Sequence, residues 1–594
     1  MAQPHSFFAR WVRLMNRVQA WRSTLARPAT GFVSQPEPRT VGSVARGRQL
    51  LAGNFMFAGH LVQAQPNAQT GAHAGAQPDA QQGLWDITPP DEAFEEELQG
   101  FAWLDDLAAV GDTPARLAAQ AWLWQWIARD GRGRGAGWSP DLAGRRLIRW
   151  IHHALFVLRA QDARESTLFY RSLAQQANFL ARRWQAAAPG LPRFESLTGL
   201  IYAGLSLQGM GRHVAPACQA LARECAQQID GDGGIPTRNP EELLEVFTLL
   251  TWAATALREA QLPIGEAHRS AIERIAPTLR SLRHADGGLA RFHGGGRGPE
   301  GRLDQALAAA AVRGLHPEGL SMGFVRQTAG RTSLIIDAAP PPQGAASMGA
   351  HASTLAFELT SGRRPLVVNC GSGVTFGVEW RRAGRATASH STLAVEGFSS
   401  ARLGRRGARG EWLVDRPTAV PIELGRTEQA LRFEGGHNGY VRTHGLTHAR
   451  QLQLSLDGRE LQGEDMLLAI EEADKRRFDA MLENTKLQGL GFDIRFHLHP
   501  DVDASLDMAG QAISMALKSG EIWVLRHDGH AQMQLDPSVY LEKGRIQPRA
   551  TKQVVLSARA IDYATRIRWS LAKAHETPMS IRDLHRDEMD LTTD

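Results

Sequence analysis

The sequence predicts a two-part fold, in which an N-terminal α/α toroid, an incomplete barrel of helix pairs, is followed by a C-terminal antiparallel β-sandwich. Between residues 95 and 310, apolar residues recur at intervals of three and four, which places them on one face of a helix. From about residue 320 the pattern changes to short alternating runs separated by turn residues, as is typical of a sandwich of antiparallel strands. At 594 residues the chain is also too long for a single core.

The helical domain is expected to cover residues 95–315. Its predicted helices are 101–110, 115–128, 142–158, 166–184, 195–209, 213–228, 240–259, 264–282 and 303–313. Glycine-rich turns at 230–234 and 286–289 separate some of them. Helix pairs that repeat every few tens of residues, with glycine turns between them, fit an α/α toroid or another helical array.

Residues 1–94 are expected to hold a basic amphipathic helix and a flexible linker. From residue 7 to 25, apolar side chains at helical spacing alternate with arginines, and no acidic residue precedes Glu37. We expect this helix to pack its apolar face on its own protein; the alternative is a peripheral contact with an anionic membrane surface. Residues 64–83 contain almost nothing that can be buried, which predicts the linker.

The sandwich domain is expected to cover residues 320–575, and residues 576–594 are expected to form a C-terminal tail. Alternating runs at 332–338, 391–397, 448–456 and 493–499 predict strands with one buried face.

Composition narrows the class of protein. An apolar fraction of 43% with 22% charged residues is that of a globular protein, and a net charge of +5 permits an anionic partner without requiring one. No basic run interleaved with aromatics predicts a nucleic-acid partner. The three cysteines form no disulfide framework, and there is no convincing signal peptide or apolar span. These features favour the cytoplasm.

Three strand-like segments each carry one polar residue in an apolar run. His351 lies in G-A-H-A-S-T-L-A-F-E-L (349–359), Asn369 in P-L-V-V-N-C-G (365–371) and His390 in A-S-H-S-T-L-A-V (388–395). Two histidines and an amide on neighbouring strands can hold zinc or bind a polar ligand. Taken singly, each residue can equally be a hydrogen-bonded polar group at a strand end.

These segments resemble the C-terminal domain of the heparinase II/III family, which is related to alginate lyases. That family carries H-x-H-x-D-x-L-S-F, then P-L-[IV]-x-D-x-G, then W-R and H-N-T. In this sequence, His351 matches the second histidine, Asn369 the aspartate and His390 the last histidine, while Trp380 and Arg381 match the W-R pair. The resemblance covers most of residues 320–570 and only weakly 95–310.

The resemblance implies a polysaccharide lyase that cleaves an acidic, uronate-containing glycan by β-elimination, with a largely structural zinc ion. It also shows departures. Gly349 stands at the first histidine of the motif and Ser353 at its aspartate, and Asn369 replaces a zinc-binding aspartate by a weaker amide ligand. In the helical domain, Glu242 stands where the family has a catalytic tyrosine.

Other residues can take over these roles. We assign His390, Tyr440 and Arg385 as candidate catalytic residues, and His351, Asn369 and His390 as candidate ligands of Zn²⁺. Candidate substrate-binding residues are Arg238, Asn239, Glu242, Arg381, His437 and Asn438. Asn239 also reads as the cap of a helix that begins at Pro240. His152, His153 and His293 are interpreted as surface or turn residues.

Three functions remain open at this level. The chain is a lyase acting on an acidic polysaccharide or oligosaccharide, or a glycan-binding or scaffold protein that kept the fold and lost the chemistry. The third is hydrolysis by a pair of acids, for which Glu242, Glu245 and Asp304 are the candidates. If the chain has the family's substrate, the cell envelope or periplasm is the alternative location to the cytoplasm. Fold alone does not decide among these functions.

Overall fold

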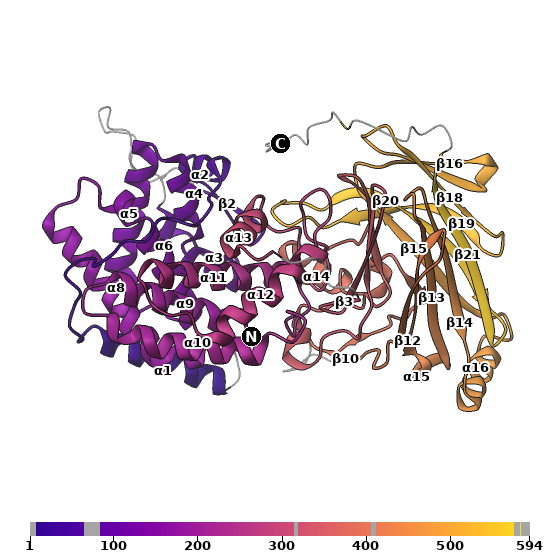
Figure 1. The fold of residues 1–594 in the computed structure, drawn as a ribbon, viewed down its shortest axis with the longest axis horizontal. Helices are drawn as coiled ribbons and strands as arrows, with labels where there is room; N and C mark the ends of the chain where they lie inside the picture. The colour runs from indigo at the N-terminus through magenta and orange to yellow at the C-terminus, as the bar shows by residue number, and fades with distance from the viewer. Residues whose placement is uncertain (1–6, 65–82, 314–318, 405–410, 575–582, 584–594) are drawn as a thin grey trace.

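The computed structural model describes residues 7–64, 83–313, 319–404, 411–574 and 583. Most of the predicted linker and all but Asp583 of the predicted tail lie outside these residues. A helical domain and a β domain lie side by side along the long axis of the molecule, as expected (Figure 1). None of the described helices combines the length and the apolar character needed to cross a membrane.

The helical domain follows the predicted pattern closely. Its helices are α1 Phe7–Ser23, α2 Val44–Leu51, α3 Glu92–Gln99, α4 Ala102–Val110, α5 Thr113–Asp130, α6 Pro140–His152, α7 Ala154–Leu158, α8 Ala163–Arg183, α9 Leu191–Ser206, α10 Val214–Gln228, α11 Pro240–Glu259, α12 Glu266–Ser281 and α13 Arg302–Ala310. The predicted helix 142–158 is broken at His153 into α6 and α7. The stripes of apolar residues meet in one core, which contains an aromatic cluster of Phe101, Trp103, Trp126 and Trp150.

Residues 7–64 pack on this domain rather than standing apart from it. The core includes Ala20, Leu50 and Phe55, from α1, α2 and the hairpin of β1 Asn54–Phe57 and β2 His60–Gln63. Gly42 lies so close to α4 that a Cβ atom there would sit 1.9 Å from the carbonyl oxygen of Asp105. This segment is therefore tightly joined to the helical domain.

The β domain contains two large antiparallel sheets. One has the strand order β11-β12-β13-β14-β21-β18-β17-β16, and the other β19-β20-β15-β7-β6-β5-β4-β3, with β8 paired to β15. The strands are β3 Leu320–Ser321, β4 Phe324–Ala329, β5 Thr332–Asp337, β6 Phe357–Ser361, β7 Arg364–Val368, β8 Leu393–Val395, β11 Ile422–Arg426, β12 Ala430–Tyr440, β13 Leu446–Ser455, β14 Glu460–Leu468, β15 Leu490–Leu498, β16 Asp503–Asp507, β17 Ala512–Ala516, β18 Ile522–His527, β19 Gln532–Tyr540, β20 Arg549–Ala560 and β21 Ala564–Lys573. Short strands β9 Arg402–Leu403 and β10 Leu413–Asp415 form a separate pair.

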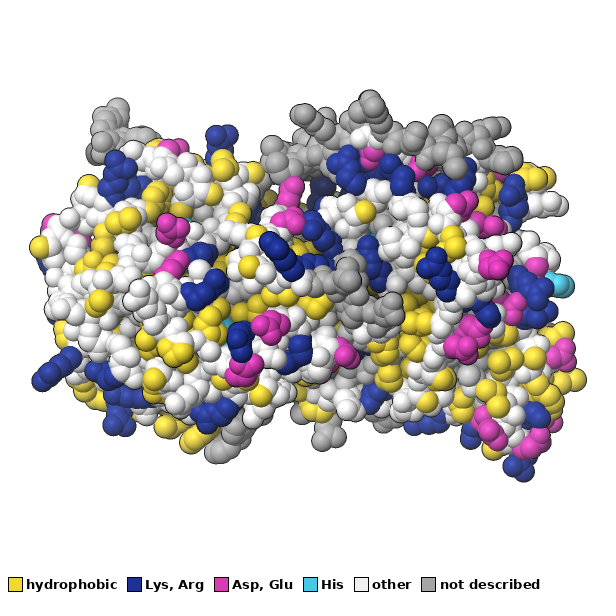
Figure 2. Space-filling model, in the orientation of Figure 1, with side chains coloured by type: hydrophobic (Ala, Val, Ile, Leu, Met, Phe, Trp, Pro, Cys, Tyr) yellow, Lys and Arg dark blue, Asp and Glu magenta, His cyan; other side chains and the backbone are white. Residues whose placement is uncertain are grey.

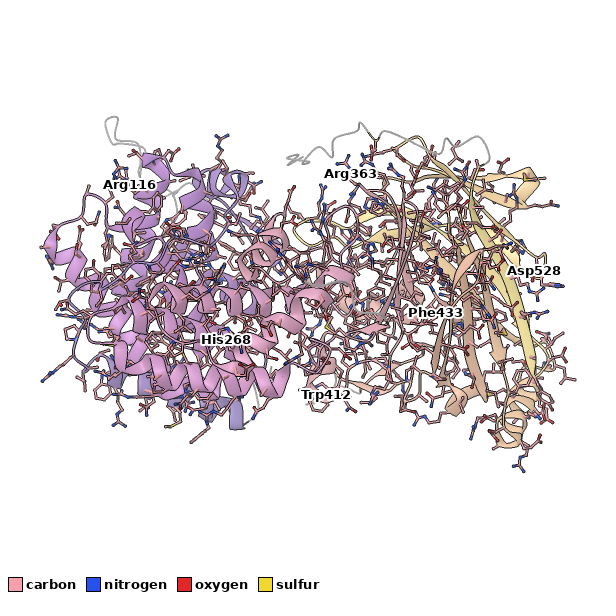
Figure 3. The ribbon with its side chains drawn as sticks, viewed as in Figure 1. Arg116, His268, Arg363, Trp412, Phe433 and Asp528 are labelled. Atoms are coloured by element: carbon pink, nitrogen blue, oxygen red, sulfur yellow. The ribbon has the colours of Figure 1, made fainter. Side chains whose placement is uncertain are left out.

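The alternating residues of the two sheets form the sandwich core. Phe357 on β6 stacks on Trp569 of β21, with ring centroids 6.0 Å apart, and Phe433 lies in the same core (Figure 3). The remaining helices of this domain are short or peripheral: α14 Val378–Ala383, α15 Val441–His444 and α16 Glu472–Asn484.

The nine-stranded sheet turns its other face to the helical domain. Phe324 and Ile335 from this sheet, and Ala356 just before β6, belong to the helical core rather than to the sandwich core. The two domains therefore share buried apolar surface, and the strand ends that carry the histidine motifs lie beside this contact.

Candidate functional site

The structure brings His351 and His390 together, as the sequence pattern predicts. His351 Nδ1 lies 3.0 Å from His390 Nε2, and both side chains are buried. His390 Nδ1 lies 2.8 Å from the carbonyl oxygen of Ala386, which can only accept, so this nitrogen carries the proton. It follows that His351 donates from Nδ1 to His390, and that His351 Nε2 holds an unprotonated lone pair.

His293, which the sequence predicted to be a surface or turn residue, completes this cluster. It does lie in a turn, but the turn is not at the surface: His293 is almost fully buried, and its Nδ1 accepts from the backbone N–H of His351 at 3.2 Å. Its Nε2 lies 3.4 Å from Asp337 Oδ2. His293 has a φ of +48°, a conformation uncommon for a residue with a side chain. The glycine run that follows it was the available signal for a tightly packed loop.

All three histidines are neutral at neutral pH. Burial lowers the pKa of His293 and of His351 well below the usual value, and lowers the pKa of His390 to about 4. A neutral imidazole with a free lone pair, as at His351 Nε2, can act as a hydrogen-bond acceptor or as a base.

The residues do not fit a zinc ion as they are arranged. In a tetrahedral zinc site, two ligand nitrogens are separated by about 3.3 Å and share no proton, since Zn–N bonds are about 2.0–2.1 Å long. His351 and His390 instead share a hydrogen bond, and Asn369 Oδ1 accepts from the backbone N–H of Ser391 at 3.0 Å. Across the part of the chain that the structure describes, no three His, Cys, Asp or Glu side chains converge as a metal site.

Arg238 joins the two domains. It reaches from the loop before α11 to Asp337 on β5, with Nη2 2.6 Å from Oδ1. Its other hydrogen bonds go to four backbone carbonyl oxygens, those of Met322, Gly323, Ala339 and Pro340. The guanidinium of this predicted substrate-binding residue therefore donates its hydrogen bonds to other groups of the protein.

Asn239 and Glu242 lie at the start of α11. Asn239 Oδ1 accepts from the backbone N–H groups of Glu241 and Glu242, so Asn239 is the helix cap that the sequence allowed. Burial raises the pKa of Glu242, whose carboxyl group lies near Thr237 and Lys543. Neither residue contacts the histidine cluster in any interaction that the structure records.

Tyr440 and His437 are buried within the β domain. The Tyr440 hydroxyl donates to the carbonyl oxygen of Leu393 at 3.2 Å, and burial raises its pKa. His437 donates to His448, which in turn donates to Asp465 at 2.8 Å. Asn438 is half-buried, and its Oδ1 accepts from the backbone N–H of Thr418. The structure thus gives these candidates packing roles.

Arg381 and Arg385 hold the loop before His351. Arg385 is buried and donates to the carbonyl oxygens of Ser347, Ala350 and Glu411 at 2.7–2.8 Å. Burial lowers its pKa to about 10. Arg381, on α14, is partly exposed and lies 3.7 Å from the carboxylate of Glu411. Of the two arginines, only Arg381 keeps a surface open to a ligand.

Comparison with known proteins agrees with this architecture. Residues 312–570 match the family model of the heparinase II/III-like C-terminal domain. The chain is 31% identical over 565 residues to FtsZ-localized protein C of Caulobacter vibrioides, covering 93% of this chain and 91% of that protein.

Solved structures extend the similarity to the helical domain. Heparinase III aligns over 96% of this chain and 93% of its own, with a TM-score of 0.67 and 12% identity. A heparan sulfate lyase of Pedobacter heparinus aligns over 96% of this chain and 92% of its own, with a TM-score of 0.53 and 14% identity. At these identities the structural similarity establishes the shared fold, a helical toroid followed by a β-sandwich. The chain belongs to the heparinase II/III-like family and is a relative of FtsZ-localized protein C.

Proposed function

We propose that this protein is a non-catalytic member of the lyase fold, which attaches to an anionic membrane surface through α1 and localises with FtsZ. The observation that carries the proposal is the outward face of α1. Trp11, Leu14, Val18 and Trp21 are 40–58% exposed, and Leu25, just beyond the helix, is 73% exposed. Exposed tryptophans grouped on one helix face are costly in water and favourable at a membrane interface.

The orientation of α1 reverses our expectation. The helix docks on α8 through its small and polar face, where Asn16 accepts from Arg183 Nε at 2.8 Å and Ala20 is buried. The expectation that its apolar face would pack on its own protein is therefore wrong. Arg10, Arg17 and Arg22 are exposed beside the apolar face, in position to meet anionic headgroups. In Figure 1, α1 runs along the lower edge of the helical domain.

The residues around the histidine cluster differ from the family motif, and this difference supports the non-catalytic part of the proposal. Gly349 stands where the family motif has its first histidine, and the candidates Tyr440 and Arg385 are committed to packing. Localisation with FtsZ is proposed from the name of the 31% identical relative.

Vesicle co-sedimentation tests the membrane contact. The purified full chain should sediment with vesicles containing anionic phosphatidylglycerol and remain in solution with pure phosphatidylcholine. The double variant Trp11→Glu/Trp21→Glu should lose this binding. Leu155→Glu is the matched control, because Leu155 is exposed on the same domain but outside α1. Equal sedimentation of both variants, or none by the wild type, contradicts the proposal.

A second candidate function is lyase activity on an acidic glycan. It is supported by the lone pair of His351 Nε2, which is unprotonated at neutral pH and can therefore serve as a general base. Incubation with heparan sulfate, alginate and hyaluronan, followed by the ultraviolet absorbance of unsaturated uronates, tests it. Product that forms with the wild type and not with His351→Ala would favour the enzyme over the scaffold.

A further inference from the structure

The outer face of the eight-stranded sheet carries a hollow of about 490 Å³. It lies on the far side of the sandwich from the helical domain, as the position of Asp528 in Figure 3 shows. The histidine cluster lies at the opposite side of the sandwich, next to the domain contact. This hollow is therefore a separate feature from the site described above.

Strand register places polar side chains in two rows across the hollow. Gln451 and Gln453 alternate with buried residues on β13, so both point outward. Gln451 lies opposite Glu464 and Gln453 opposite Gln462 on β14. The rows continue to Arg568 and Ser570 on β21 and to Arg526 on β18. Four strands spaced about 4.8 Å apart span roughly 14 Å, which suits a short oligomer better than a single small molecule.

Three amides form the centre of these rows. The side chains of Gln451 and Gln453 make no hydrogen bond to any other residue that the structure describes, and Gln462 uses one N–H toward Glu460 at 3.1 Å. Each free amide presents both donors and an acceptor in one plane. Sugar hydroxyl groups also donate and accept, so adjacent hydroxyls can pair with such an amide on both of its sides.

The charges around the amides cancel. The lining contains two carboxylates, of Glu464 and Asp528, and two guanidiniums, of Arg526 and Arg568. Arg568 Nε donates to Glu464 at 2.6 Å. Because no net charge remains, the hollow favours neither an acidic nor a basic polymer. Trp569, the large apolar side chain among the lining residues, is buried, so it offers no exposed aromatic ring to the side chains of a peptide.

We infer that this hollow binds a neutral oligosaccharide through the amides of Gln451, Gln453 and Gln462. The site differs in place and in charge from the interdomain region where an acidic glycan would lie. The inference does not depend on membrane attachment. A negative result in the vesicle experiment would therefore not contradict sugar binding, and a negative result for sugar binding would not contradict membrane attachment.

Saturation-transfer difference NMR with maltohexaose, cellohexaose and chitohexaose tests the inference, with a heparin hexasaccharide as the acidic comparison. At least one neutral hexasaccharide should bind the full chain more tightly than the acidic one. The double variant Gln453→Ala/Gln462→Ala should weaken this binding about tenfold, as expected for the loss of one or two hydrogen bonds.

Gln534→Ala is the matched control, because Gln534 is an exposed glutamine on β19 of the other sheet. Circular dichroism and the melting temperature check that each variant is folded. The inference is overturned if no neutral hexasaccharide binds, if the heparin hexasaccharide binds as well or better, or if the double variant binds like the control.

Discussion

The guanidinium of Arg238 lies 2.6 Å from the carboxylate of Asp337, and both side chains are removed from solvent at the contact between the two domains. Ser353 donates to the second oxygen of the same carboxylate at 2.6 Å, and His293 approaches it. The carboxylate thus ties the helical domain, the loop that carries the histidines and the sheet together. Its neutralisation depends on one arginine from the other domain.

Replacing Arg238 should therefore destabilise the protein strongly. Arg238→Met leaves Asp337 buried without a counter-charge, and we expect a loss of about 3–5 kcal/mol in the free energy of unfolding. Urea denaturation measures the loss. Arg283→Met is the control, because Arg283 pairs with Asp304 at the surface, where such a pair contributes about 0–1 kcal/mol. Similar losses in the two variants would argue against a structural role for the buried pair.

Local signals made much of the fold predictable. Helix α11 begins and ends where the sequence predicted, because Asn239 and Pro240 form a start signal that needs no tertiary contact. The change from helical to alternating periodicity near residue 320 likewise marked the change of domain. The meeting of His351 and His390 followed from motifs at the ends of neighbouring strands.

The roles of the candidate site residues were not predictable in the same way. Tyr440 and Arg385 have chemistry that suits catalysis, but their side chains point into packed regions that only the tertiary structure defines. His293 lies in a turn, as the glycines after it indicated, but its burial depends on the second domain. For α1, periodicity identified an apolar face without indicating which face docks. On the surface shown in Figure 2, acidic and basic side chains are intermixed, a pattern that net charge alone cannot reveal.

His152 gives a prediction for acid stability. Both of its ring nitrogens are buried and have no hydrogen-bond partner among the described residues, and burial lowers the pKa of His152 to about 3. Between about pH 6.5 and pH 3 the unfolded chain takes up a proton at this residue and the native protein does not. Stability is therefore lost as the pH falls, at up to about 1.4 kcal/mol per pH unit.

The variant His152→Phe removes this penalty and keeps an aromatic ring against Tyr202 and Trp252. We expect it to be at least as stable as the wild type at pH 7.5 and to lose less stability between pH 6.5 and pH 5. Urea midpoints at each pH measure this. His530→Phe, at an exposed position, should follow the wild type. A steeper acid loss in His152→Phe would show that the unpartnered ring is not the cause.

Metal content is predicted from the hydrogen bond between His351 and His390. Since this bond and the Asn369–Ser391 contact occupy the candidate ligands, protein purified without a metal-affinity tag should contain well under one zinc ion per chain. Elemental analysis of the wild type, His351→Ala and His390→Ala measures it. Stoichiometric zinc that disappears in both variants would mean that the side chains rearrange around a metal.

Substitutions at Gly349 test most directly whether the missing histidine of the family motif explains a lack of lyase activity. A Cβ atom at this position would meet only the carbonyl oxygen of His293, at 3.6 Å, and its φ of −99° suits any residue. Gly349→Ala should therefore change the stability by less than about 1 kcal/mol. Gly371→Ala is the contrast, because Gly371 has a φ of +93° and its Cβ would lie 2.7 Å from a backbone oxygen, so about 1–3 kcal/mol should be lost.

Gly349→His then restores a histidine where the family motif has one, in a position that tolerates a side chain. If this single absence explains a lack of activity, the variant should release unsaturated uronate from heparan sulfate or alginate while the wild type does not. If Glu242 and the packed Tyr440 also prevent catalysis, the variant should fold and remain inactive, which is the result we expect. The double variant Gly349→His/His351→Ala is the control. If Gly349→His is more active than this double variant, our view that the site has lost more than one catalytic group is wrong.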